Sequence, residues 1–360
     1  MAMALAEGER AAGNTSPNPI VGAVLARDGA AIAFGHHERA GAPHAEAVAI
    51  ERAGEAARGA TLYVTLEPCA HRGRTPPCTE AILRAGIARV VVAATDDDRH
   101  VRGAGIERLR AAGIRVEVGP GQAQAHEMNR MYSHQRRSGR PFVTLKMAQS
   151  ADGAIGLRPG ERFALTGHEA ETFVHRLRYE HDAVMVGVGT VVVDDPQLTV
   201  RPHRDRTVPY RRIVVDGGAR TPHDRHVVRD LAVAQTTIVV TAQAPSERVA
   251  ALRAAGADVL ECASSGDGRV DLRDMLERLG AGGMLGILCE GGPTLASALL
   301  DAELANELDL LVAPVVLGSA SSVPAFAPLR DPHRLRLRST TRLGEDILYV
   351  ARFGRRDNEG

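Results

Sequence analysis

The chain has 360 residues, a length that predicts about two domains at roughly 100–200 residues each, and 44% of its residues are hydrophobic, as in ordinary folded proteins. A formal net charge of zero and 3% aromatic residues argue against a nucleic-acid-binding surface, and no apolar run reaches the ~20 residues that span a bilayer. The N-terminus lacks a signal-type apolar stretch, so we expect a cytoplasmic protein. Because that compartment is reducing, we expect the cysteines to be metal ligands or buried thiols rather than disulfide partners. The chain has four of them: Cys69, Cys78, Cys262 and Cys289.

The first 120 residues predict strands alternating with helices. Asp28-Gly29 is a turn signal between two apolar runs and predicts a hairpin. Strands are expected over residues 20–27, 30–35, 61–66, 89–95 and 114–118. Helices are expected over residues 44–57, 79–85 and 105–112. This alternation predicts an α/β layered domain.

A polar helix predicted over residues 123–137 ends at Ser138-Gly139-Arg140-Pro141, where we place the domain boundary. The expected domains are therefore residues 1–139 and 140–360. Strands are expected over residues 142–147, 183–188, 212–216, 237–241, 258–261, 285–289 and 307–312. Helices are expected over residues 168–179, 246–255, 272–279 and 294–301. The sequence shows no internal repeat, which favours two different domains.

Four residues of the first half form a pattern typical of a catalytic zinc site. One imidazole, His44, and two thiols, Cys69 and Cys78, suit Zn²⁺ and leave a fourth position for a water whose pKa the metal lowers. Glu46 lies two residues after His44, where its carboxylate can reach that water without being a ligand. It would carry the proton to the ring nitrogen and the leaving amine. The alternative is a closed structural zinc site or two buried thiols.

Two features stand out in the second half. Lys146 is the only lysine among 44 basic side chains, which indicates either an accident of composition or a position that needs an ammonium group. Gly291 and Gly292 precede a helix that begins with Pro293, so its N-terminus can hold a pyrophosphate. A plain turn is the alternative. The run is not a G-x-G-x-x-G fingerprint, so we do not predict a Rossmann domain.

Several motifs together resemble the bifunctional deaminase–reductases of riboflavin biosynthesis, from about residue 15 to about residue 318. In the first half they are TSPNPIVGAV (15–24), AGAPHAE (40–46) and TLEPCAHRGRTPPC (65–78). In the second half they are LKMAQSADG (145–153), VGVGTVVVDDPQLTVR (186–201) and EGGPTL (290–295). Zinc deaminases share an H-x-E…P-C-x-x-C pattern. Here eight residues separate the cysteines, and this spacer distinguishes the chain from tRNA adenosine and cytidine deaminases.

The resemblance implies an N-terminal cytidine-deaminase-like three-layer α/β domain and a C-terminal dihydrofolate-reductase-like α/β domain. It implies zinc-dependent hydrolytic deamination of 2,5-diamino-6-ribosylamino-4(3H)-pyrimidinone 5′-phosphate at ring carbon 2. NADPH then reduces the ribosyl group to ribityl. The expected partner is this small pyrimidine ribotide, with neither nucleic acid nor membrane, and the formation of a homo-oligomer stays open.

The same resemblance assigns residues to each site. It implies substrate contacts by Asn18, His37, Arg74, Arg178, Leu198, Arg201 and Glu290. It implies nucleotide contacts by Ala148, Thr190, Asp194, Gly292, Pro293, Thr294, Leu295, Ala296, Ser297 and Ala298. Arginines pair well with phosphate, which fits the three predicted here. We expect Lys146 to polarise or protonate the sugar oxygen and Glu290 to orient the sugar. The alternatives are a turn asparagine, a surface histidine, solvated arginines and a turn cap at Asp194.

Two segments depart from the family pattern. Asp96-Asp97-Asp98-Arg99 stands where the family has Asp-Pro-Asn-Pro. Residues 160–166 read GERFALT where the family has Gly-x-Ser-x-Trp-Ile-Thr, so Arg162 replaces a substrate-contacting serine and Ala164 replaces a tryptophan that packs on the nucleotide. These changes keep two alternatives open: a deaminase with a degenerate reductase domain, and a nucleic-acid-editing zinc deaminase.

Overall fold

The computed structural model describes residues 1–72, 76–98, 101–159, 163–202, 206, 208–318 and 321–354. The chain divides into two compact units. The first comprises Met1–Arg140 with Arg206–Val208, and the second comprises Pro141–Asp205 and Pro209–Gly360. Each unit has its own sheet and its own hydrophobic core. Among the described residues, no helix has the length and apolar character needed to cross a membrane.

The first unit contains a five-stranded sheet in the order β2-β1-β3-β4-β5. Its strands are β1 (Gly22–Arg27), β2 (Ala30–His36), β3 (Thr61–Leu66), β4 (Arg89–Ala94) and β5 (Arg115–Val118). β1 pairs antiparallel with β2 and β3, whereas β3, β4 and β5 run parallel. Asp28 and Gly29 both have positive φ, at 52° and 81°, as a tight hairpin turn requires. The predicted hairpin is confirmed.

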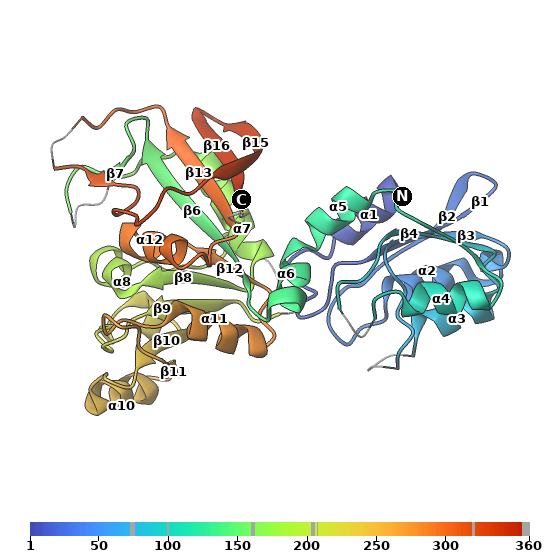
Figure 1. Ribbon diagram of the computed structural model, residues 1–360, viewed down its shortest axis with the longest axis horizontal. Helices are drawn as coiled ribbons and strands as arrows, with labels where there is room; N and C mark the ends of the chain where they lie inside the picture. Colours follow the sequence, from blue (N-terminus) through green and yellow to red (C-terminus); the bar gives the residue numbers. More distant parts are fainter. Residues whose placement is uncertain are drawn as a thin grey trace, which may run out of the picture. The chain divides into compact units, whose positions relative to one another are not determined.

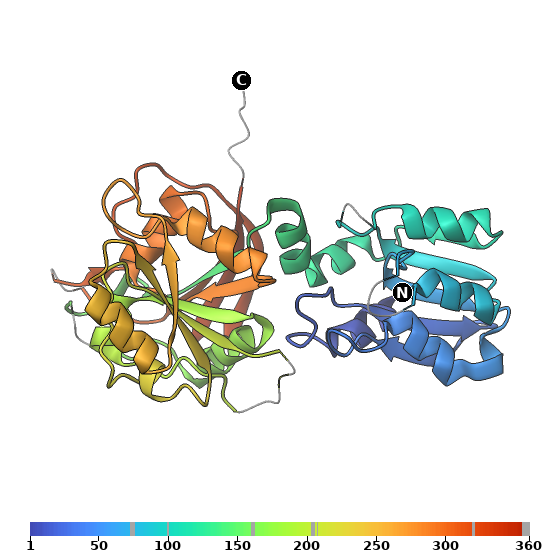
Figure 2. The same cartoon turned by 90° about the horizontal axis from the view of Figure 1, so that it is seen from below.

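Helices cover both faces of this sheet and make three layers (Figure 1). They are α1 (Ala2–Glu9), α2 (Ala45–Ala53), the 3₁₀ turn η1 (Gly54–Ala57), α3 (Cys78–Ala85), α4 (Ala104–Ala111), α5 (Gln122–Met128) and α6 (Arg130–Ser138). α2, α3 and α4 lie side by side on one face (Figure 2), where Ala49, Ile82 and Leu109 are fully buried in the core. Ala125 of α5 packs on the opposite face together with Leu5 of α1. The predicted three-layer class is confirmed.

Two local predictions in this unit were incomplete. α1 was not predicted from the sequence. The single helix predicted over residues 123–137 was wrong, because the chain breaks at Asn129 into α5 and α6. The buried Asn129 amide accepts a hydrogen bond from Ile20 N at 2.8 Å and donates one to Ile20 O at 2.9 Å. A side chain that satisfies distant backbone groups in this way ends a regular helix without any nearby Gly or Pro signal.

The second unit is built on a nine-stranded sheet in the order β11-β10-β9-β8-β12-β6-β13-β16-β15. Seven neighbouring strands, from β11 to β13, run parallel, and β16 and β15 add an antiparallel edge. The strands are β6 (Phe142–Ser150), β8 (Ala183–Gly187), β9 (Arg211–Val215), β10 (Gln235–Thr241), β11 (Asp258–Cys262), β12 (Gly286–Cys289), β13 (Glu307–Ala313), β15 (Leu335–Leu343) and β16 (Asp346–Phe353). A separate two-stranded sheet pairs β7 (Ala154–Gly156) with β14 (Val323–Pro324).

Helices again cover both faces of the parallel region. They are α7 (His168–Glu180), α8 (Val188–Asp194), α9 (His226–Arg229), α10 (Ser246–Ala254), α11 (Leu272–Ala281) and α12 (Pro293–Asp301). α11 and α12 pack into one core, whereas α8, α9 and α10 pack into another that uses the alternate residues of the same strands. Parallel sheets are stable when both faces are covered in this way. The sequence did not predict the β15–β16 hairpin or the short helices α8 and α9.

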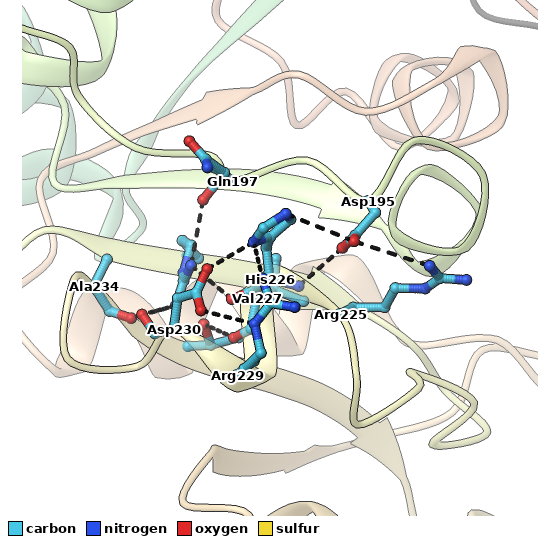
Figure 3. Close-up of polar contacts among 10 residues, drawn as sticks. Asp195, Gln197, Arg225, His226, Val227, Arg229, Asp230 and Ala234 are labelled. Atoms are coloured by element: carbon cyan, nitrogen blue, oxygen red, sulfur yellow. Dashed lines mark hydrogen bonds and ion pairs between the residues drawn. The ribbon is translucent and has the colours of Figure 1, made fainter.

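A fully buried arginine, Arg212 of β9, ties together the segments beside α9. Its guanidinium donates at 2.5–3.3 Å to the main-chain carbonyl oxygens of Gln197, His226, Asp230 and Ala234. These four acceptor residues are labelled in Figure 3. None of these acceptors is a carboxylate, and burial lowers the pKa of Arg212 to about 10. The arginine therefore supplies donors to four backbone acceptors, of which the Ala234 carbonyl belongs to a buried residue.

We expect Arg212→Met to lower the free energy of unfolding by about 3 kcal/mol or more, because four hydrogen bonds to backbone carbonyls are lost at about 0.5–1.5 kcal/mol each. Denaturant unfolding of the full chain measures this change. Arg211→Met is the matched control: the Arg211 side chain is 48% exposed, and the expected change is within about 0.5 kcal/mol. Equal stabilities of the two variants would show that the buried arginine does not hold these segments.

Candidate active sites

His44, Cys69 and Cys78 converge in the first unit at the ends of three elements. His44 is the N-cap of α2, Cys69 follows β3, and Cys78 is the first residue of α3. His44 Nδ1 lies 3.1 Å from Cys78 Sγ and 3.6 Å from Cys69 Sγ, and the three ligand atoms all lie within 4.8 Å of one another. Ligands placed tetrahedrally at about 2.0–2.3 Å from one ion lie about 3.5 Å apart. The donor set and its spacing therefore fit a zinc ion with three protein ligands.

A buried carboxylate that the sequence reasoning missed holds the turn containing Cys69. Glu67 accepts hydrogen bonds from the backbone N–H groups of Gly103 and Gly105 at 2.9 Å and from two neighbouring amides. A Cβ at Gly105 would lie 1.8 Å from Pro68 O, so only glycine permits this approach. Glu67 lies within the T-L-E-P-C motif, and its role becomes visible only when the chain 36 residues away folds over it.

A cavity of about 410 Å³ opens beside the cluster and is lined by His44, Glu46 and Cys69. Glu46 is 3% exposed, and burial raises the pKa of its carboxyl group to about 7. Glu46 is therefore placed to bind and release a proton near neutral pH, and it lies beside the cluster without belonging to it.

Asn18 and His37 line the same cavity and contact each other. Asn18 Nδ2 lies 3.0 Å from His37 Nε2, and His37 Nδ1 lies 3.1 Å from Pro43 O. Because the carbonyl can only accept, we assign the imidazole proton to Nδ1, which leaves Nε2 to accept from Asn18. Burial lowers the pKa of His37, which agrees with a neutral ring. Arg74, the third predicted substrate contact, lies outside the described residues.

Further lining residues of this cavity were not predicted as site residues from the sequence. Tyr132 and Arg136 on α6 line the cavity together with Asp96 and Asp98, which follow β4. The Tyr132 hydroxyl donates to Asp96 Oδ1 at 3.1 Å, and Arg136 Nε lies 3.6 Å from Asp98 Oδ2. The acidic run that departs from the family pattern is thus partly balanced by a cation on α6. Arg99, at the end of that run, lies outside the described residues.

A cavity of about 450 Å³ in the second unit lies at the carboxyl ends of β12 and β8, where parallel α/β sheets bind ligands. It is lined by eight of the predicted site residues: Lys146, Ala148, Arg178, Thr190, Asp194, Arg201, Glu290 and Gly292. Gly292 is the N-cap of α12 and has no side chain that could accept from the first amides of that helix. This uncapped helix start fits a phosphate group of a nucleotide.

Arg178 and Glu290, which both line this cavity, form a bidentate ion pair. Arg178 Nε donates to Glu290 Oε1 at 2.6 Å and Nη2 donates to Oε2 at 2.9 Å, while Nη1 donates to Thr199 O at 2.9 Å. Burial raises the pKa of Glu290, but the Arg178 charge outweighs it and the net shift is downward. Burial lowers the pKa of Lys146, with Glu290 opposing and Arg178 adding to the shift. The site thus contains the ionised carboxylate of Glu290 and the ammonium group of Lys146, which releases its proton more readily than an exposed lysine does.

Other predicted contacts of the second unit are not among the residues that line the cavity. Leu198 is 4% exposed, packs into the core with α8 and α9, and has a φ of 52°. Leu295, Ala296 and Ser297 are buried in α12, and Ser297 Oγ donates to Ala327 O at 3.0 Å. Pro293 and Ala298 are half-buried, and Thr294 is exposed. The predicted roles of these residues stay predictions.

The segment where the family has a tryptophan reaches the same cavity. Phe163, Ala164 and Thr166 line it, and the Phe163 ring is 39% exposed. Arg162 and the two residues before it lie outside the described residues. An exposed ring next to Ala164 gives the cavity one aromatic surface, although it stands one position earlier than the family's tryptophan.

The three-layer fold and the His–Cys–Cys cluster define the first unit as a domain of the zinc-binding deaminase class. The family model for the cytidine and deoxycytidylate deaminase zinc-binding region matches residues 1–94, and the model for the RibD C-terminal domain matches residues 141–349. The chain belongs to the RibD family of riboflavin biosynthesis proteins.

Relatives match along nearly the whole chain. The riboflavin biosynthesis protein RibD of Aquifex aeolicus is 38% identical over 356 residues, covering 98% of both chains. The Escherichia coli protein of the same name is 36% identical over 363 residues, covering 96% of both. Among solved structures, Acinetobacter baumannii RibD is 35% identical with a TM-score of 0.88 and covers 98% of both chains. This membership favours two enzymatic domains over a nucleic-acid-editing deaminase.

Proposed function

We propose that this chain deaminates a diaminopyrimidinone ribotide in its first unit and reduces the deaminated ribotide with NADPH in its second. The observation that carries the proposal is a His–Cys–Cys zinc-ligand set beside buried Glu46, in a chain whose other unit holds a Lys–Arg–Glu cavity. The relative from Thermotoga maritima, with a TM-score of 0.85 and 30% identity over 98% of this chain, is described as a diaminohydroxyphosphoribosylaminopyrimidine deaminase/5-amino-6-(5-phosphoribosylamino)uracil reductase. The same two substrates are proposed here.

In the deaminase, His44, Cys69 and Cys78 would hold zinc, which when bound supplies hydroxide near neutral pH by lowering the pKa of water. Glu46 takes the two protons of the attacking water in turn and delivers the first to the ring nitrogen and the second to the departing amine. Asn18 and His37 bind the polar edge of the pyrimidine, since their contact fixes both side chains. The net step replaces the amino group on ring carbon 2 by oxygen and releases ammonia.

In the reductase, the start of α12 at Gly292 and the α8 residues Thr190 and Asp194 would bind NADPH, which supplies the hydride. Lys146 Nζ donates a proton to the ring oxygen of the sugar as the hydride adds to carbon 1 and the bond between carbon 1 and that oxygen breaks. Glu290, held by Arg178, orients the sugar. Arg201 binds the 5′-phosphate, because its side chain is 56% exposed at the cavity. One hydride and one proton convert ribosyl to ribityl.

The proposal places the deaminase in residues 1–139 and the reductase in residues 140–360. It also includes a cytoplasmic location, because four cysteines without a disulfide suit a reducing compartment.

Mass spectrometry of the ribotide tests the two proposed activities: with NADPH present, the product should show loss of ammonia followed by addition of two hydrogens. An unchanged ribotide in the presence of zinc and NADPH would contradict the proposed substrate.

We expect Cys69→Ser to lose zinc, because a serine hydroxyl is a poor substitute for a thiolate ligand. Metal analysis of the purified chain should show most of the zinc gone and ammonia release lost with it. The matched control is Cys262→Ser in β11 of the second unit, which should keep its zinc. Full zinc occupancy in Cys69→Ser would show that the ligand set is wrong.

A further inference from the structure

Helix α7 carries a histidine, His175, that lines the reductase cavity. No role was predicted for it from the sequence, and the proposed mechanism does not use it. Glu171, His175 and Arg178 are spaced by four and three residues, so they lie on one face of the helix, and all three line the cavity. His175 is 7% exposed. A buried imidazole on a cavity wall, next to two predicted phosphate ligands, is placed to act on one of them.

His175 contacts the main chain of Arg201. The backbone N–H of Arg201 donates to His175 Nδ1 at 3.0 Å. Because an amide N–H only donates, Nδ1 must be unprotonated, so the neutral ring carries its proton on Nε2. Nε2 lies 3.8 Å from Glu171 Oε1, and the Arg201 guanidinium lies 3.9 Å from the same oxygen. α7 therefore holds both the backbone and the side chain of Arg201.

The segment that leads to Arg201 is anchored upstream by other groups. Asp195 Oδ1 accepts from His226 N at 2.8 Å, and Gln197 O accepts from the buried Arg212 (Figure 3). Thr199 O accepts from Arg178 at 2.9 Å. These contacts fix the path of the segment as far as residue 199 without His175. The hydrogen bond from Arg201 N to His175 then sets the direction in which the Arg201 side chain leaves the main chain.

We propose that His175 is a positioning residue that holds Arg201 toward the 5′-phosphate of the ribotide, and that it does so only when its ring is neutral. The inference rests on the proposed reductase function. A protonated ring has an N–H at Nδ1, which would point at the Arg201 N–H instead of accepting from it. Ribotide affinity should therefore fall as the pH falls.

The charges around His175 set the direction of this effect. Burial lowers the pKa of His175, and the positive charges of Arg178 and Arg201 lower it further, while Glu171 and Glu290 oppose them. The ring therefore stays neutral at neutral pH and loses its acceptor only on the acid side. Since the pKa is lowered, the contact contributes above that value and is lost as the pH falls through it.

The test compares His175→Ala with His175→Asn. Asn places an amide oxygen on Cγ, where His carries Nδ1, so it keeps an acceptor and cannot titrate. Reduction of preformed 5-amino-6-(5-phosphoribosylamino)uracil is followed by NADPH absorbance from roughly pH 5 to 8. We expect His175→Ala to raise the KM for the ribotide about tenfold, the size of one lost hydrogen bond of about 1.4 kcal/mol, with kcat within about twofold. His175→Asn should restore the KM.

The pH profile separates positioning from a structural role. As the pH falls, the KM of the wild type for the ribotide should rise several-fold more than the KM of His175→Asn. The phosphate, whose second pKa is about 6, titrates in both enzymes, so the ratio of the two profiles is the readout. His168→Asn, at the exposed start of the same helix, is the matched control and should follow the wild type.

Two results would overturn the inference: a wild-type KM in His175→Ala, or the same acid-side rise in His175→Asn as in the wild type. Calorimetric binding of the ribotide gives the same comparison without turnover. Binding that follows the expected order in a chain that oxidises no NADPH would uphold His175 and contradict the reductase function. If His175→Ala does not fold, the profile of His175→Asn decides.

Discussion

Glu46→Gln is expected to lower ammonia release from the diaminopyrimidinone ribotide by about 10²–10⁴-fold, the usual contribution of a positioned general acid–base group. The amide has the shape of the carboxyl group but cannot accept and return a proton. Glu46 is buried beside the zinc-ligand cluster and has its pKa raised to about 7, so it can exchange protons near neutral pH. Ammonia release and zinc content are measured on the same preparation.

Zinc should remain in Glu46→Gln, because Glu46 is outside the ligand cluster formed by His44, Cys69 and Cys78. Glu51→Gln changes an exposed carboxylate on the same helix and should release ammonia at the wild-type rate. Wild-type turnover in Glu46→Gln would remove the proton-carrying role. Loss of zinc from that variant would instead assign Glu46 to the metal site.

Lys146→Met is expected to lower NADPH oxidation by about 10²–10⁴-fold while ammonia release stays unchanged. Lys146 lies on the cavity wall near Glu290 and Arg178, and burial lowers the pKa of its ammonium group. Methionine fills a similar volume without a proton to give. The deaminase activity of the same chain is the internal control, since the change lies in the other unit.

The variant Lys146→Arg tests whether a positive charge at this position is sufficient for reduction. A guanidinium holds its proton far more tightly than an ammonium, so this variant should bind NADPH and the ribotide but stay slow in reduction. Cofactor titration of both variants should show binding close to the wild type. Normal reduction in Lys146→Met would mean that the single lysine is an accident of composition.

The sequence predicted the elements whose residues form continuous apolar runs. β3 was predicted at its observed bounds, Thr61–Leu66, and β10 within two residues, because each has buried residues along most of its length. The β15–β16 hairpin was missed because every residue of β15 except the last is exposed, which leaves no hydrophobic alternation to read. Its position depends on pairing with β13 through β16, which is a tertiary contact.

The site residues divide in the same way, into those predicted from local motifs and those that only tertiary contacts bring to the site. The zinc-ligand residues and Glu46 lie in two short motifs, AGAPHAE (40–46) and TLEPCAHRGRTPPC (65–78), so local spacing was enough to predict them. Tyr132 and Arg136 come from α6, outside both motifs, and only the folded chain brings them to the cavity. His175 gave no signal either, because a histidine on a helix face acquires meaning only from the Arg201 amide that it meets.

The central claim is that two activities act in sequence on one ribotide. The most direct measurement follows ammonia and NADPH absorbance together after the zinc-loaded chain receives the diaminopyrimidinone ribotide. NADPH oxidation should begin after ammonia release, and a chelator that removes zinc should stop both. Ammonia release without NADPH oxidation would contradict the account and favour a deaminase with a degenerate reductase domain, with Ala164 as the first residue to examine. NADPH oxidation that precedes ammonia release would contradict the order of the two steps.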